Sequence, residues 1–200
     1  MKSIFEQGYF NAYRVDSLNE ATYPVYESEL FHSYDRASRK TTVFISHKHD
    51  ELNDLKGIIG FLEKNYNVKA YIDSKDNKMP QKTSSETASR IKEKIKQCDK
   101  FILIATNGAI ESKWCNWELG YGDAQKFQKN IAIFSMKPFC SQDSSYVGNE
   151  YMRIYPYIIY CDGSEKDTND RNVKSGYYVC TEDDEGKMNI ISLTDWLSKR

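Results

Sequence analysis

From Thr41 onward the chain alternates short apolar runs with longer amphipathic stretches, and this alternation constrains the fold more than any other feature of its 200 residues. The apolar runs have the length of strands, and the amphipathic stretches repeat their apolar residues with the period of a helix. Such alternation is typical of βαβ units built around a parallel sheet. A chain of this length forms one α/β core with appendages, since two full domains would be a tight fit. We therefore expect one doubly wound α/β domain.

Five strands are predicted, at residues 42–46, 68–72, 101–106, 131–135 and 157–160. The run at 101–106 is apolar without interruption, as expected for a strand at the centre of a parallel sheet covered on both faces. Two helices are predicted between the first three strands, one with an apolar face from Leu52 to Leu62 and one capped by Ser84 or Ser85. These elements together predict a flavodoxin-like, five-stranded parallel sheet.

The two ends of the chain differ from this core. Residues 1–40 are rich in aromatic side chains, and Ser17-Leu-Asn-Glu20 is a capping-box pattern that predicts a helix running toward residue 38. Residues 177–180 and 188–192 flank an acidic turn that contains Gly186, which predicts a hairpin, and a helical turn is expected at 194–197. We therefore expect an N-terminal arm (1–40), a core domain (41–162) and a hairpin extension (163–200) packed on the same domain.

Composition excludes several functions. The 28 basic and 29 acidic residues give a net charge of −1, which provides no field for nucleic acid or an anionic membrane. No apolar run approaches the roughly 20 residues of a membrane helix, and the first residues lack the apolar core of a signal peptide, so a cytoplasmic protein is expected.

The five cysteines form no C-x-x-C pair and are expected to be reduced and mostly buried. His47 and His49 with Asp50 lack a third clear ligand, so we expect no metal.

The stretch from Ser112 to Gly122 carries the clearest functional signal. Ser112 is a plausible N-cap, and a helix that starts there places Trp114 and Glu118 one turn apart. Trp117 and Tyr121 form the adjacent row, so the acid is predicted to lie among aromatic rings. An acid is almost never buried without a partner or a task. The alternative is a core helix that uses tryptophan as filler.

Two glycines follow Glu118 inside the same predicted helix. Each costs roughly 1 kcal/mol relative to alanine at an interior helical position. Gly120 and Gly122 therefore predict that another element packs against this helix at backbone distance.

Polar residues follow three of the predicted strands. The first strand ends at Ser46 and His47, the second at Asp73 and the third at Thr106, just before the helix that carries Glu118. Ligands of open α/β sheets bind outside the carboxyl ends of the strands, so these groups are expected to converge. The chain contains no Walker A motif, and its glycines do not fit a dinucleotide fingerprint, which excludes a Rossmann dehydrogenase.

One carboxylate without a partner acid limits the reaction. Ordinary glycoside hydrolysis uses two carboxyl groups, because a sugar alkoxide leaves poorly unless it is protonated. Nicotinamide leaves NAD+ as a neutral molecule, so one glutamate that stabilises an oxocarbenium-like transition state would be sufficient. An indole could also stack on the cationic pyridinium, in a contact worth roughly 0.5 to 2 kcal/mol.

These segments resemble a Toll/interleukin-1 receptor (TIR) domain over about residues 41–160. The resemblance rests on Val43-Phe-Ile-Ser-His47, the loop after Tyr71-Ile-Asp73, the strand at 101–106 and Ser112-Lys-Trp-Cys-Asn-Trp-Glu-Leu119. Members of the family that carry this glutamate cleave NAD+, some by hydrolysis and others by forming a cyclic ADP-ribose isomer. Bacterial members look like the signal-producing half of antiphage systems such as Thoeris.

The resemblance implies roles for individual residues. Glu118 would be the catalytic residue and Trp114 would line its pocket. Phe44, Ser46 and His47 lie where the first strand and loop of the family contact substrate. Residues 73–83, beginning at Asp73, correspond to the mobile loop that controls access and self-assembly. NAD+ is implied as a substrate, with no separate cofactor, and a downstream effector would sense the product.

Two other functions fit part of the pattern. A TIR adaptor without enzymatic activity would use the aromatic helix as core and bind partners through residues 73–83, although Glu118 argues against it. A nucleoside deoxyribosyltransferase-like enzyme would share the sheet type and use its carboxylate as a covalent nucleophile.

Overall fold

The centre of the computed structural model is an eight-stranded mixed sheet, and the structure describes all residues except 16–39, 49–51, 73–83, 168–169, 184–185 and 200. The strands are β1 (Phe5–Glu6), β2 (Thr41–Ser46), β3 (Val68–Tyr71), β4 (Lys100–Ala105), β5 (Ile131–Lys137), β6 (Tyr157–Cys161), β7 (Gly176–Glu182) and β8 (Met188–Ser192). The α-helices are α1 (Leu52–Tyr66), α2 (Ser85–Gln97), α3 (Asn107–Glu111), α4 (Lys113–Lys126), α5 (Asn149–Ile154) and α6 (Leu193–Ser198).

The five predicted strands form the parallel part of this sheet. Strands β3, β2, β4, β5 and β6 lie side by side in that order, and each neighbouring pair runs parallel. This is the flavodoxin-like order that the sequence predicts. β3 lies on one side of β2, and β4 lies on the other side. The direction in which successive strands are added therefore reverses here, so the switch point of the sheet lies between β2 and β4.

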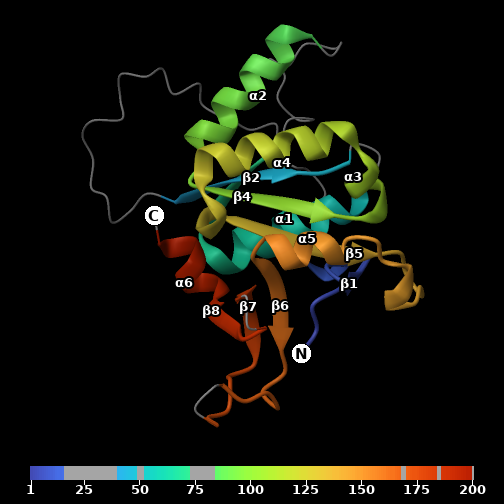
Figure 1. Ribbon diagram of the computed structural model, residues 1–200, viewed down its shortest axis with the longest axis vertical. Coiled ribbons are helices and arrows are strands. Elements are labelled where there is room, and N and C mark those ends of the chain that lie inside the picture. The colour runs from blue at the N-terminus through green and yellow to red at the C-terminus, as the bar shows by residue number, and fades with distance from the viewer. Residues whose placement is uncertain (16–39, 49–51, 73–83, 168–169, 184–185, 200) are drawn as a thin grey trace.

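Helices cover both faces of the sheet (Figure 1). α1 and α6 pack on one face, and α2, α3 and α4 pack on the other. Every residue of β4 is buried, and its side chains alternate between the two cores, Ile102 on the α1 side and Leu103 on the α4 side. The prediction of a central strand covered on both faces is therefore confirmed.

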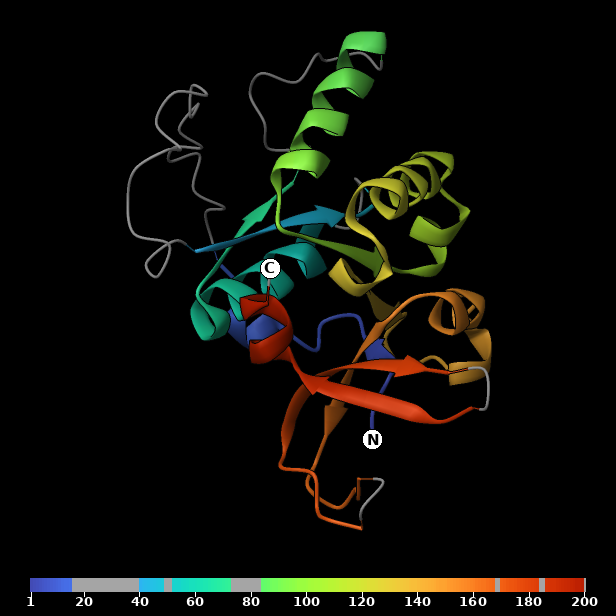
Figure 2. The ribbon, with the colours of Figure 1, turned by 60° about the vertical axis from the view of Figure 1, so that its left-hand side comes forward.

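The C-terminal hairpin is confirmed, but it enlarges the sheet beyond the five strands predicted. β7 pairs antiparallel with β6, and β8 pairs antiparallel with β7, so both strands continue the central sheet (Figure 2). The predicted final helical turn is α6. It is anchored by Trp196, whose Nε1 donates a hydrogen bond to the Lys129 carbonyl oxygen at 2.8 Å.

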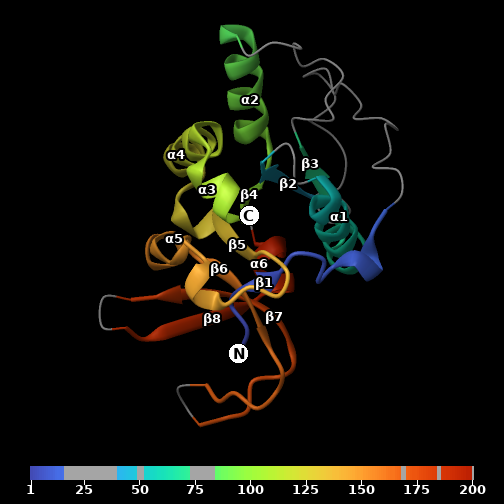
Figure 3. The same ribbon diagram turned by 90° about the vertical axis from the view of Figure 1, so that its right-hand side faces the viewer.

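The described part of the N-terminal arm is built into the same core (Figure 3). β1 pairs with the carboxyl end of β5, and the rings of Phe5 and Phe10 are buried. Gly60 of α1 lets the chain pass close to this helix, because a Cβ there would lie 2.0 Å from the Tyr13 carbonyl oxygen. A strand of two residues has no periodicity, so the sequence could not predict β1. The predicted helix after Ser17 lies outside the described residues.

A buried lysine lies at the opposite edge of the sheet from the strand ends that the sequence analysis singles out. Lys100 is 1% exposed; its Nζ donates to Asn130 Oδ1 at 2.6 Å and lies 4.8 Å from the ring centroid of Trp196. Burial disfavours the charged form and lowers the pKa of Lys100 to about 8. This amine therefore links the start of β4 to the C-terminal helix.

Two remaining sequence predictions concern cysteines and membranes. The five cysteines are free thiols, and all but Cys140 are buried, as predicted. Within the described ranges, no helix is long and apolar enough to cross a membrane.

Candidate active site

The structure brings Ser46 and Glu118 together beside the switch point of the sheet. Ser46 is the last residue of β2, and Glu118 lies in the second turn of α4. Ser46 Oγ donates a hydrogen bond to Glu118 Oε2 at 2.6 Å, and the two residues are 1% and 2% exposed. This length lies within the ordinary range of O–H···O hydrogen bonds. The acid is therefore buried with a partner that fixes one of its oxygens.

The N-cap of α4 and its close packing on β4 keep Glu118 buried. Ser112 is the N-cap, as predicted, and its Oγ accepts from the Cys115 backbone N–H at 3.3 Å. Gly122 lies over the ring of Phe101 in β4, where a Cβ would come within 2.9 Å of a ring carbon. The predicted close packing is confirmed at Gly122. It is wrong at Gly120, where a Cβ would meet nothing within 4 Å.

A short helix that the sequence analysis missed comes before α4. Thr106, predicted as the end of a strand, is the N-cap of α3, and its Oγ1 accepts from the Ala109 N–H at 2.9 Å. Asn116 of α4 donates through Nδ2 to the Ile110 carbonyl oxygen at 2.8 Å, and it accepts a hydrogen bond from the Tyr151 hydroxyl of α5. These bonds fix the first turn of α4 against α3 and α5.

The aromatic side chains of α4 form one stacked row. The indole of Trp114 stacks on that of Trp117, with centroids 4.9 Å apart, and Trp117 stacks on Tyr121. The helical spacing predicts Trp114 beside Glu118, with the other two rings in an adjacent row. In the structure the half-buried Trp114 ring belongs to that row, one helical turn from Glu118.

The other predicted substrate contacts have different surroundings. His47 is buried directly after β2, with Nδ1 3.4 Å from the Ile45 carbonyl oxygen. Phe44 is 0% exposed and stacks on Phe101 at 5.5 Å, which places it in the core under α4. Asp73 and the predicted mobile loop lie outside the described residues. The substrate contacts of these residues stay predictions.

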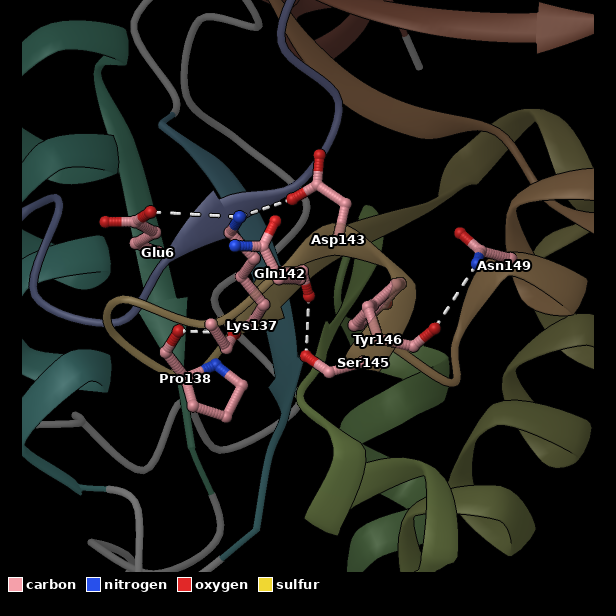
Figure 4. A network of polar contacts seen from close by, with 9 residues as sticks. Glu6, Lys137, Pro138, Gln142, Asp143, Ser145, Tyr146 and Asn149 are labelled. Atoms are coloured by element: carbon pink, nitrogen blue, oxygen red, sulfur yellow. Dashed lines mark hydrogen bonds and ion pairs between the residues drawn. The ribbon is translucent and has the colours of Figure 1, made fainter.

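A loop after β5 forms the neighbouring part of the same sheet edge (Figure 4). Lys137, the last residue of β5, forms ion pairs with Asp143 and, at 3.8 Å, with Glu6 of β1. Asn107, which follows Thr106, donates to the Ser145 carbonyl oxygen at 2.8 Å and accepts from the Val147 N–H at 3.0 Å. The two Asn107 bonds and the Lys137–Glu6 ion pair join positions 38 or more residues apart, and no local sequence pattern predicts them.

The predicted absence of a metal site stays a prediction. In the part of the chain that the structure describes, no cluster of three or more histidine, cysteine, aspartate or glutamate side chains could hold a metal ion. His49 and Asp50 lie outside that part.

The family model for the TIR domain matches residues 43–171, which is more than half of the chain. The protein therefore belongs to the TIR domain family, as the motifs around Ser46 and Glu118 indicate.

Known proteins that are similar to the chain include a curated relative and a solved structure. A Bacillus cereus (strain MSX-D12) protein, named "Probable 3' cyclic ADP-D-ribose synthase ThsB'", is 29% identical over 144 residues, which cover 71% of this chain and 72% of the relative. The crystal structure of a prokaryotic SEFIR domain superposes with a TM-score of 0.38 and 15% identity, over 54% of this chain and 73% of that one.

Proposed function

We propose that the protein cleaves the nicotinamide–ribose bond of NAD+, with Glu118 as the catalytic residue. The observation that carries this proposal is the buried hydrogen bond between Ser46 Oγ and Glu118 Oε2 beside the switch point of the sheet. A carboxylate fixed in place before substrate binds can stabilise positive charge that develops on the ribose, without a reorganisation cost during the reaction.

The leaving group explains why one carboxylate is enough for this reaction. Nicotinamide departs as a neutral molecule, so no general acid has to protonate it. In the proposed reaction, Ser46 keeps Glu118 Oε2 in one orientation while the carboxylate orients the ribose hydroxyls and stabilises the oxocarbenium-like transition state. Trp114 is proposed to stack on the nicotinamide ring, since an indole face attracts a cationic pyridinium.

The products are nicotinamide and either ADP-ribose or a cyclic ADP-ribose isomer. Support for a cyclic product comes from the printed name of the Bacillus cereus relative, a probable 3' cyclic ADP-D-ribose synthase. After nicotinamide leaves, attack of water on the ribose carbon that held it gives ADP-ribose. Attack on the same carbon by another group of the ADP-ribosyl unit closes a ring. We propose that the product is a signal in bacterial antiphage defence, sensed by a separate effector in the cytoplasm.

Self-association is part of the same proposal. The resemblance to the family assigns access to the site and assembly to residues 73–83. On this basis, specific activity should increase with protein concentration or crowding, and a specific activity that is constant over a wide concentration range would count against assembly.

Product analysis tests the function. The protein is incubated with NAD+, and the products are separated by chromatography and identified by mass spectrometry. Equal amounts of nicotinamide and of ADP-ribose or its cyclic isomer support the proposal. Intact NAD+ under all conditions would favour the adaptor. Base exchange on nucleosides, with a trapped glycosyl-enzyme and no NAD+ cleavage, would favour the deoxyribosyltransferase-like enzyme.

A further inference from the structure

Trp114 is the first ring of a column of three aromatic side chains on α4. Its centroid lies 4.9 Å from that of Trp117, with 26° between the ring planes, and the Trp117 centroid lies 6.2 Å from that of Tyr121, with 15° between planes. Both separations lie in the range of offset-stacked aromatic pairs. Trp117 therefore supports one face of Trp114, and Tyr121 supports Trp117.

A lysine of the neighbouring helix holds the far part of this column. Lys92 of α2 places its Nζ 5.7 Å from the centroid of Trp117 and 5.4 Å from that of Tyr121. A cation at this distance from a ring is attracted by the negative charge of its face. Because α2 packs directly against α4, the column is held by two helices.

We propose that Trp117 and Tyr121 are positioning residues that hold the indole of Trp114 in the orientation in which it stacks on nicotinamide. This inference rests on the proposed function. Trp114 is only half-buried, and exposed side chains change rotamer within picoseconds to nanoseconds unless neighbours hold them. A ring that is already oriented loses less conformational freedom when substrate binds. The two supporting rings therefore act on substrate binding and need not touch the reacting atoms.

The kinetic signature of this role is a change in KM. Support that stabilises bound substrate and transition state equally changes KM and leaves kcat as it was. A stacked aromatic pair is worth a factor of about 2 to 10 in an equilibrium constant. Trp117→Ala should raise KM for NAD+ by about that factor, and Trp117→Phe, which keeps a ring, should restore most of the loss.

Circular dichroism can show whether Trp114 and Trp117 are still stacked. Two indoles stacked at 4.9 Å couple their electronic transitions, so the wild type should show an exciton couplet that both Trp117 variants remove. Trp196→Phe is the matched control, because Trp196 lies in the core on the other face of the sheet. It should keep the couplet and the wild-type KM.

The outcomes separate this inference from the function on which it rests. If Trp117→Ala does not fold, Tyr121→Ala removes the half-buried ring at the other end and should raise KM in the same direction. An unchanged KM in folded Trp117→Ala together with loss of the couplet, or an unchanged KM in folded Tyr121→Ala, overturns the positioning role even where the wild type cleaves NAD+ and Glu118→Gln does not. A wild type that leaves NAD+ intact overturns both proposals.

Discussion

Ser46→Ala removes the hydroxyl that donates to Glu118 Oε2 and changes little else, because the side chain is small and lies at the end of a buried strand. A hydrogen bond to a charged group is worth about 1.5 to 3 kcal/mol. Both residues are almost fully buried, so water is poorly placed to replace the lost donor. If the bond holds the carboxylate in its reactive orientation, kcat should fall by a factor of about 10 to 150, since each 1.36 kcal/mol is tenfold in rate.

The assay is steady-state release of nicotinamide, with folding checked by circular dichroism. Ser135→Ala is the matched control: Ser135 is a buried serine near the carboxyl end of β5, and its hydroxyl is not bonded to Glu118. KM should change by less than about threefold in Ser46→Ala, because the lost bond acts on the reacting carboxylate. A folded Ser46→Ala protein with kcat within about twofold of wild type would refute the positioning of Glu118 by Ser46.

Three further predictions follow from the fold and from the helix that carries Glu118. The unfolded chain binds the Lys100 proton up to pH 10.5 and the folded chain only to about pH 8, so the contribution of Lys100 to stability should rise between these values by up to about 3 kcal/mol; in urea unfolding, the difference in stability between wild type and Lys100→Met should change by this amount over that range, and an identical pH dependence of the two proteins would refute the lowered pKa. Gly60→Ala should lower stability by about 2 kcal/mol or more, because its Cβ would overlap the Tyr13 carbonyl oxygen; Gly120→Ala, the control with open space, should raise it by about 1 kcal/mol, and equal stability of the two variants would count against this packing. Trp114→Phe should mainly raise KM, because a ring remains beside the carboxylate, whereas Trp114→Ala also removes the apolar ring one turn from Glu118 that we expect to tune and position this acid, and should lower kcat by more than about tenfold; wild-type turnover of a folded Trp114→Ala protein would make Trp114 core filler.

The strands of the parallel sheet could be located from the sequence because buried parallel strands are nearly continuous apolar runs. The run at 101–106 is the clearest of them, and the flavodoxin-like sheet predicted around it is confirmed. Elements too short for periodicity were missed: β1 has two residues and α3 has five. Both depend on contacts with distant parts of the chain, and such contacts leave no local pattern.

The candidate site was predictable as a set of residues but not as a geometry. Ser46 and Glu118 could each be named from motifs, yet they are 72 residues apart and their hydrogen bond follows only from the packing of α4 on β2 and β4. The glycines illustrate the same limit, since Gly120 and Gly122 carry the same local signal. Only Gly122 faces the sheet, and two residues along a helix point in different directions.

Nicotinamide release by Glu118→Gln measures whether Glu118 is the catalytic residue. The substitution keeps the volume of the side chain and removes its charge. Glu111→Gln is the matched control, because Glu111 is an exposed acid on the neighbouring helix α3. We expect Glu118→Gln to retain the wild-type circular dichroism spectrum and to release nicotinamide at least about a thousandfold more slowly, while Glu111→Gln matches wild type. A folded Glu118→Gln protein that releases nicotinamide at near the wild-type rate would show that Glu118 is not the catalytic residue.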